Sequence, residues 1–174
     1  MLLRNYYNQL HSLFGGQTIA NGLKKPDGTL IDSVFPSSTE SFRLDSTFKS
    51  AGTTFRTSYS SYGFVVGSGR TPVSVDDYCL ESLITTAGHL SVVQSTDENG
   101  NYVWIGTFTN QATTPITIGE FGITMSCYYK YTTTAVCLVE RTVLDEPITL
   151  GAGESCFISY KIGFAPTVGS FPTA

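Results

Sequence analysis

From residue 53 to the C-terminal tail, the apolar residues follow the pattern of β-strands, and no segment there has the period of a helix. Runs of β-branched and aromatic residues alternate with short turn sequences. This spacing argues against parallel βαβ units. The sequence therefore predicts an all-β fold, an antiparallel β-sandwich of immunoglobulin-like or jelly-roll-like type. The expected turns are Gly67-Ser68-Gly69, Thr113-Thr114-Pro115, Asp145-Glu146-Pro147 and Gly151-Ala152-Gly153.

The clearest local signal is Asn99-Gly100, which lies between two β-rich runs. This pair can supply both positive-φ positions of a type I′ turn, so it predicts a β-hairpin. After the turn, Tyr102, Trp104 and Phe108 have the same parity and are expected on one face of a strand. Further strand-like runs occupy residues 53–67, 73–84, 116–129, 133–144 and 155–164.

The N-terminal part of the chain differs from the rest. Its first fourteen residues have apolar side chains at helical spacing, which allows a short amphipathic helix ended by Gly15-Gly16. Between residues 15 and 50, Gly, Pro and Ser are dense and apolar residues stand singly, which predicts an extended, irregular segment. The expected organisation is an N-terminal extended arm at 1–51, a β-sandwich domain at 52–165 and an irregular tail at 166–174.

The N-terminal arm carries aromatic rings that a solvated linker does not need. Such rings provide apolar area for protein contacts. We therefore interpret the arm as an assembly segment that becomes ordered against neighbouring subunits. The alternative is that it folds back over its own sandwich and covers an edge strand. The expected assembly contacts are Tyr6, Tyr7, Phe14, Phe35, Phe42 and Phe48.

The sequence offers few groups for catalysis. A Ser-His-Asp or Cys-His mechanism would have to use His11 or His89, and neither lies in a matching motif. Asp76, Asp77 and Glu81 form the densest acidic group, but adjacent strand residues point to opposite faces. We expect this group to accept hydrogen bonds from the backbone. The sequence predicts no catalytic residues and no enzymatic activity.

No cofactor or metal is expected either. The chain has no glycine motif that would cradle a phosphate. A partial match to a calcium-binding loop occurs at Asp97, Asn99 and Asn101, which have the spacing of its first three ligands. The glycine, however, falls at the fourth position of the loop instead of the sixth. The cysteines form no CxxC pair. We expect buried thiols, with disulfides as the alternative because a sandwich can bring distant cysteines together. The four are Cys79, Cys127, Cys137 and Cys156.

The charge of the chain bears on its partners. A net charge of -4 and a pI near 5.0, without a basic stripe, argue against nucleic-acid binding. Polar residues interrupt the apolar ones near the N-terminus, which argues against a secretory signal. No run of about 18 apolar residues predicts a membrane span. We expect synthesis in the cytoplasm and no membrane partner.

Three strings carry a resemblance to a known class of protein. They are VVGSGRTPVSVDDYCLESLI at 65–84, FTNQATTPITIGEFGI at 108–123 and LVERTVLDEPITLGAGESCFISYKI at 138–162. Together they resemble a β-rich module of proteins encoded by tailed phages and prophages, especially those of gut bacteria. The second and third strings are also similar to immunoglobulin-like accessory domains.

This resemblance implies a structural virion protein. Its expected place is the head-tail region, the tail, or the capsid exterior as an accessory component, after synthesis in the host bacterial cytoplasm. It implies contacts with other virion proteins and with copies of the same chain in a symmetric assembly. The resemblance supplies no catalytic residues.

A second hypothesis is a receptor- or glycan-binding module of a phage tail fibre. The aromatic content and the polar loops favour it, and Trp104 could provide a stacking surface for a sugar. Trp104 equally fits the core of a strand, because it shares its parity with Tyr102 and Phe108. A host-surface receptor would then be the partner.

Replacing Gly100 by Val is expected to lower the free energy of unfolding by about 1 kcal/mol or more, because a β-branched residue is strained where φ is positive. Gly100→Asn is the matched control, since Asn tolerates positive φ. Urea unfolding of both variants makes the comparison. An unchanged midpoint for Gly100→Val would show that Asn99-Gly100 forms another type of turn.

Overall fold

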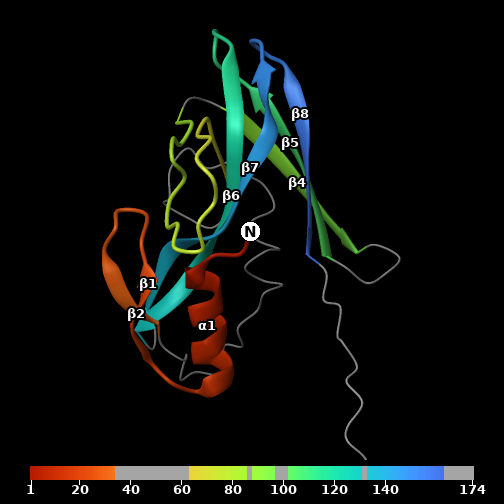
Figure 1. Cartoon of the computed structure of the whole chain (residues 1–174). Coiled ribbons are helices and arrows are strands. Elements are labelled where there is room, and N and C mark those ends of the chain that lie inside the picture. The colour runs from red at the N-terminus through yellow and green to blue at the C-terminus, as the bar shows by residue number, and fades with distance from the viewer. Residues whose placement is uncertain (34–62, 86–87, 97–101, 131–132, 163–174) are drawn as a thin grey trace, which may run out of the picture.

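The computed structural model describes residues 1–33, 63–85, 88–96, 102–130 and 133–162 (Figure 1). This part of the chain contains a single helix and eight strands. They are α1 (Arg4–Gly15), β1 (Ile19–Lys24), β2 (Leu30–Ser33), β3 (Gly63–Gly67), β4 (Gly88–Thr96), β5 (Tyr102–Asn110), β6 (Ile116–Lys130), β7 (Thr133–Leu150) and β8 (Ser155–Ile162).

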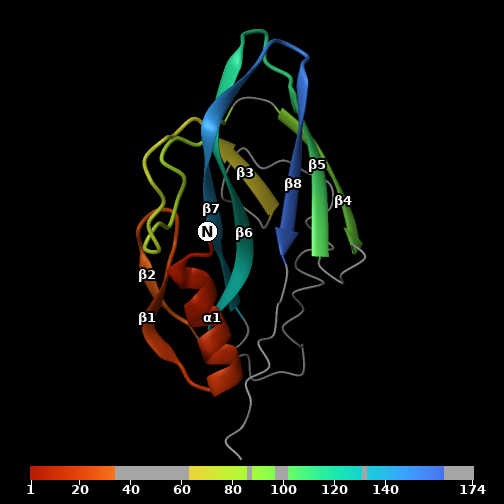
Figure 2. The ribbon, with the colours of Figure 1, turned by 45° about the vertical axis from the view of Figure 1, so that its right-hand side comes forward.

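All strand pairings in the described residues are antiparallel, which confirms the prediction of an all-β fold. β1 and β2 form a two-stranded sheet, and the other strands form two three-stranded sheets in the orders β3-β6-β7 and β4-β5-β8. Figures 1 and 2 show these two sheets close together where β5 leads into β6 and β7 leads into β8, and farther apart at the other end.

β4 and β5 are paired along their whole length, from Gly88 opposite Asn110 to Thr96 opposite Tyr102. The expected hairpin is therefore present. The turn residues Asn99 and Gly100 lie outside the described residues, so the type of turn stays a prediction.

One apolar cluster includes side chains from both three-stranded sheets. Phe108 of β5 is fully buried, and the rings of Phe64 on β3 and Tyr160 on β8 meet edge to face with centroids 6.5 Å apart. Burial of these groups provides the main driving force for folding. The buried members are Tyr6, Leu23, Phe64, Val66, Phe108, Ile118, Ile123, Met125, Cys127, Cys137, Val139 and Leu150.

All four cysteines are free thiols, in agreement with the first of the two expectations. Cys127 and Cys137 are fully buried on β6 and β7, and Cys79 and Cys156 are half-buried. The neighbouring Cys137 thiol and burial raise the pKa of Cys127 well above its ordinary value. A thiol that stays protonated is a poor nucleophile, so Cys127 serves as part of the core.

Asn110 connects the loops at the end where the two sheets meet. It is fully buried, and its Nδ2 group donates to the carbonyl oxygens of Thr114, Leu150 and Gly151 at 3.0, 3.1 and 3.0 Å. Its Oδ1 atom accepts the N–H of Ala112 at 2.9 Å. This side chain therefore holds the β5–β6 and β7–β8 connections together.

The first residues of the chain run along the outer edge of β7. The N–H of Leu3 donates to the carbonyl of Val139 at 2.9 Å, and the N–H of Arg141 donates to the carbonyl of Met1 at 3.1 Å. Leu3 and Tyr6 are buried. Residues 1–33 thus lie against the β3-β6-β7 sheet of the same chain. This is the arrangement given above as the alternative to an arm that is ordered by neighbouring subunits. Residues 34–51 lie outside the described part.

The helix expected in the first fourteen residues is present; it ends at Gly15 and is capped by Gly16, whose φ is 62°. β1 and β2, however, occupy part of the segment that was expected to be irregular. Asn5 of α1 explains the ordering of β1: its Oδ1 accepts the N–H of Lys24 at 2.7 Å, and its Nδ2 donates to the carbonyls of Lys24 and Leu138, both at 2.9 Å. One side-chain amide thus connects the backbones of β1 and β7.

Two further expectations were wrong. Residues 73–84 form turns and loop, apart from a bridge between Leu83 and Gly67, because side chains bind their backbone N–H groups in place of a neighbouring strand. Asp145-Glu146-Pro147 is not a turn between strands but lies within β7. There the register passes from Ile118 opposite Ile148 to Glu120 opposite Val143, which leaves residues 144–147 in a bulge where Pro is tolerated.

Replacing Asn110 by Ala is expected to lower the free energy of unfolding by about 1–3 kcal/mol, because it leaves buried carbonyl groups without donors. Chemical denaturation measures the change. Thr113→Ala, at an exposed position of the adjacent turn, is the control and should stay within about 0.5 kcal/mol of the parent chain. Equal losses in both variants would contradict the role given to the Asn110 amide.

Candidate contact surface

Two charged side chains are buried side by side on β6 and β7. The side chains of Glu120 and Arg141 are 0% and 3% exposed, and Nε of Arg141 donates to Oε2 of Glu120 at 2.7 Å. Moving such a pair out of water is costly unless the remaining oxygens and N–H groups also find partners. In this fold the partners come from the loop at residues 68–83, which follows β3.

Glu120 binds the backbone of this loop at both of its ends. Oε1 accepts the N–H of Gly69 at 3.1 Å and the N–H of Ser82 at 2.9 Å, and Oε2 accepts the N–H of Glu81 at 3.2 Å. The carboxylate therefore replaces a neighbouring strand as acceptor for these groups. This accounts for the ordered but irregular course of the loop.

Arg141 binds the middle of the loop. Its Nη1 donates to Oδ2 of Asp77 at 2.7 Å, and its Nη2 donates to the carbonyl oxygen of Thr71 at 3.3 Å. Oδ2 of Asp77 also accepts the N–H of Ser74 at 2.9 Å. The guanidinium group thus spans Glu120 on the sheet and Asp77 on the loop.

Glu81 closes the first turn of the loop. Its Oε2 accepts the N–H groups of Thr71 and Arg70 at 2.8 and 2.6 Å. These two backbone donors, Thr71 first, lower the pKa of the Glu81 carboxyl group below its ordinary value. We call Thr71, Asp77, Glu81, Glu120 and Arg141 the Glu120–Arg141 cluster.

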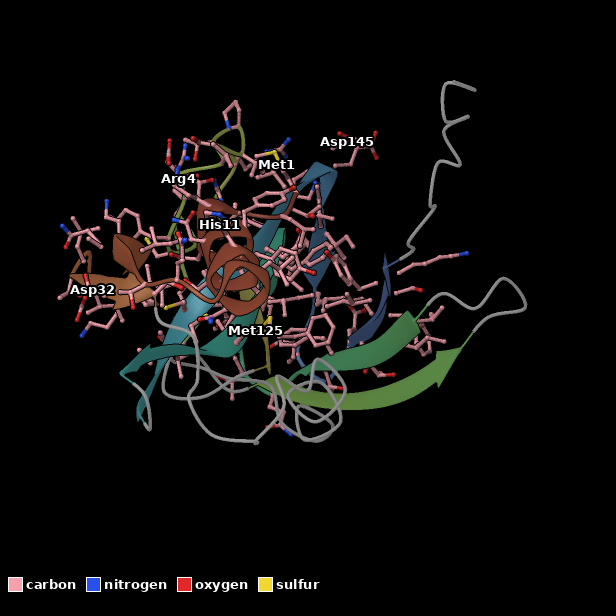
Figure 3. The ribbon with its side chains drawn as sticks, turned by 90° about the horizontal axis from the view of Figure 1, so that it is seen from below. Met1, Arg4, His11, Asp32, Met125 and Asp145 are labelled. Atoms are coloured by element: carbon pink, nitrogen blue, oxygen red, sulfur yellow. The ribbon has the colours of Figure 1, made fainter. Side chains whose placement is uncertain are left out.

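The loop also touches the bulge of β7. Nη2 of Arg70 donates to the carbonyl of Asp145 at 3.0 Å, and Figure 3 shows Asp145 on the opposite side of the molecule from Asp32 of β2. Gly119 allows this approach, because a Cβ atom there would lie only 2.6 Å from the carbonyl oxygen of Gly69. The loop, β6 and the bulge therefore pack as one unit.

The three strings that carry the resemblance meet in this cluster. The first contributes Thr71, Asp77 and Glu81, the second contributes Glu120, and the third contributes Arg141. The expectation that the acidic group binds backbone is confirmed for Asp77 and Glu81. The Asp76 side chain is not part of the cluster and forms an ion pair with Arg4 of α1. In the described ranges no group of three or more His, Cys, Asp or Glu side chains is placed to hold a metal ion.

An apolar groove lies between β8 and the β6–β7 pair. It has a volume of about 190 Å³, and Phe157 and Ile148 beside it are 77% and 39% exposed. The walls belong to three different strands, so the groove depends on how the two sheets are placed. Its lining residues are Ile118, Phe121, Leu144, Ile148, Cys156, Phe157, Ile158 and Ser159.

Sequence reasoning missed this surface. On the last strand Ile158, Tyr160 and Ile162 alternate with Ser159 and Lys161, and this alternation predicts the strand without Phe157. Phe157 has the parity of Ser159 and Lys161, which are exposed. A large ring on the polar side of an alternating strand was the available signal.

The structure describes the side chains of two of the six predicted assembly contacts, Tyr6 and Tyr7. Tyr6 is 5% exposed in the core, whereas Tyr7 is 52% exposed, with the two ring centroids 5.9 Å apart. The side chains of Phe14, Phe35, Phe42 and Phe48 lie outside the described residues. Of the six rings, the structure therefore describes Tyr6 and Tyr7, one buried and one exposed.

The other side chains considered for chemistry are scattered or undescribed. His11 is exposed on α1 (Figure 3). His89 lies near the start of β4 opposite Thr109, and Trp104 lies in β5 opposite Gln94 and Tyr160, but neither side chain is described. Asp97, Asn99 and Asn101 fall outside the described ranges.

The comparisons with known proteins gave no match: no family model, no curated protein and no solved structure resembles this chain at a significant level. Within the described residues, no helix has the length and apolar character needed to cross a membrane.

Replacing Arg141 by Met is expected to lower the free energy of unfolding by about 3–5 kcal/mol, because it leaves the buried Glu120 carboxylate without its charged partner. Adding Glu120→Gln to this variant removes the stranded charge and should recover part of the loss. Urea unfolding of the parent, the single variant and the double variant measures both effects. A double variant less stable than Arg141→Met alone would contradict this account.

Proposed function

We propose that this chain is a structural virion protein of a tailed phage, placed in the head-tail region, the tail or the capsid exterior, and that it acts through protein-protein contacts. The assignment to a phage particle rests on the resemblance of the three strings. The assignment to contact making rests on the groove beside Phe157. We further infer that the two three-stranded sheets are the layers of a β-sandwich of immunoglobulin-like or jelly-roll-like type, since both supply residues to one core cluster.

The observation that carries the contact function is the exposed apolar surface at Phe157 and Ile148. Single exposed apolar residues are common on soluble proteins. Here a phenylalanine that is 77% exposed stands next to an apolar groove and on a strand at the edge of its sheet. Apolar side chains gathered at one place in this way are typical of sites that bind another protein.

The Glu120–Arg141 cluster fixes the position of β6, which carries part of this surface. Ile118 and Phe121, which line the groove, are close neighbours of Glu120 on β6. Because Glu120 is held by the loop and by Arg141, the strand that carries these two side chains has one fixed position. A preformed surface binds a partner with a smaller loss of conformational entropy than a mobile one.

The receptor- or glycan-binding alternative has less support. It depends on exposed aromatic rings at loops, and Trp104 lies within a strand with an undescribed side chain. Glycan binding is therefore kept as an outcome of the test.

Replacing Phe157 by Ser is expected to reduce incorporation of the chain into phage particles by about tenfold or more while leaving its fold intact, because the ring is mostly exposed in the free chain. Quantitative mass spectrometry of purified particles measures incorporation, and circular dichroism checks the fold. Leu30→Ser, at a residue 54% exposed on β2, is the matched control.

Absence of the parent chain from particles would reject the virion assignment. Unchanged incorporation of Phe157→Ser would reject the groove as the contact site. Binding on a glycan array that is lost on Trp104→Ala, with the fold retained, would favour the tail-fibre alternative.

A further inference from the structure

We propose that Glu140 makes the docking of the first residues of the chain dependent on pH. Met1 to Leu3 stay against β7 while the Glu140 carboxyl group carries a proton, and they detach more often once this group is ionised. The inference goes beyond the proposed function, because it concerns how the fold responds to its surroundings and not what the contact surface binds.

Glu140 lies on β7 at the place where the N-terminus docks. Leu2 forms a β-bridge with it, and backbone hydrogen bonds of Met1 and Leu3 to β7 lie on either side. Figures 1 and 2 show the N-terminus beside β7. The Glu140 side chain is 1% exposed, and its Oε1 atom lies 2.8 Å from the α-amino group of Met1. The first residues of the chain therefore help to cover this carboxyl group.

The two oxygens of the Glu140 carboxyl group have unequal partners. Oε1 accepts hydrogen bonds from the Met1 ammonium group at 2.8 Å and from the Thr142 hydroxyl group at 2.5 Å. Oε2 is buried, and no group in the described part of the chain donates a hydrogen bond to it. A buried, ionised carboxylate with one bare oxygen is costly, because that oxygen has lost its water without gaining a donor. The docked state therefore favours the neutral acid.

The nearest arginine does not neutralise Glu140. Arg141 follows it on β7, but the guanidinium group donates to Glu120 and Asp77 in the Glu120–Arg141 cluster. Successive residues of a strand point to opposite faces of the sheet. Glu140 therefore lies on the other face, away from this cation.

On its own face, Glu140 meets one cation and the hydroxyl group of a tyrosine. The Met1 ammonium group and the Thr142 hydroxyl group favour the ionised carboxylate, but burial outweighs both and raises the pKa of Glu140 above its ordinary value. Across the core, burial first and then the Glu140 charge raise the pKa of Tyr160 on β8, with a smaller effect from Tyr6 of α1. Neither phenol brings a positive charge that would stabilise the carboxylate.

The docked and the detached states bind the proton of Glu140 with different strength. In the detached state the carboxyl group is solvated and ionises near the ordinary glutamate pKa of about 4.3. In the docked state its pKa is higher. Docking therefore takes up a proton between these two pKa values. It is strongest below the lower value and weakens as the pH rises through the higher one.

Detachment changes the edge of β7. The carbonyl oxygen of Val139 and the N–H of Arg141 now bind the first residues, and Leu3 is fully buried. Once these bonds open, the edge presents an unpaired donor and acceptor that can pair with another strand. A rise in pH thus converts a covered edge into an open one.

Hydrogen exchange of the purified full chain tests the proposal. After correction for the intrinsic rate, protection of the Leu3 N–H should fall by about threefold or more between about pH 5 and about pH 7, because Glu140 loses its proton over this range. Glu140→Gln keeps the shape of the side chain and cannot ionise, so it should show no such fall. Glu146→Gln makes the same change at an exposed position of β7 and should respond to pH as the parent chain does.

Equal protection of the Leu3 N–H at both pH values in the parent chain would overturn the proposal, as would a fall of the same size in Glu140→Gln. If Glu140→Gln does not fold, an NMR titration of the Glu140 carboxyl carbon in the parent chain decides. A midpoint above the ordinary value of about 4.3 supports the proposal, and a midpoint at or below it overturns the proposal. Because these measurements use the free chain, their outcome is independent of whether the protein is found in particles.

Discussion

The buried ion pair of Glu120 and Arg141 is the interaction on which the rest of the fold depends. Two charges in a protein core are stabilising only when every remaining oxygen and N–H group is satisfied. Here that requirement is met by the backbone N–H groups of Gly69, Glu81 and Ser82 and by the carboxylate of Asp77. The charges on β6 and β7 and the loop at 68–83 are therefore ordered together, and neither would be stable in this form without the other.

This dependence explains which features the sequence could predict. The strands β4 to β8 were predicted because their apolar residues alternate over many positions, a property that does not depend on distant partners. The segment at 73–84 has the same local composition, yet it forms a loop. Carboxylates bind N–H groups of this segment: Asp77 accepts from Ser74, and Glu120 accepts from Glu81 and Ser82. Nothing in the local pattern shows that a carboxylate as far along the chain as Glu120 will supply the acceptor.

The candidate contact surface was predictable only in part. Glu120 and Arg141 stand in the sequence as ordinary charged residues on strands, and only the β6–β7 register brings them together. The aromatic residues of the N-terminal segment were expected to make the contacts, yet Tyr6 is used in the core. The sequence does not single out Phe157, because the alternation of Ile158 and Tyr160 with polar residues already predicts the strand. In addition, a groove between two sheets cannot be located before the positions of both sheets are known.

The bulge of β7 has a consequence for the long hairpin. It interrupts the hydrogen-bonded ladder between β6 and β7, so the hairpin consists of a short ladder that ends at Ile118 and Ile148 and a longer ladder that begins at Glu120 and Val143. The bond from Arg70 to the Asp145 carbonyl ties the bulge between them to the loop at 68–83. Where the ladder is interrupted, a segment from outside the hairpin therefore fixes the course of the chain.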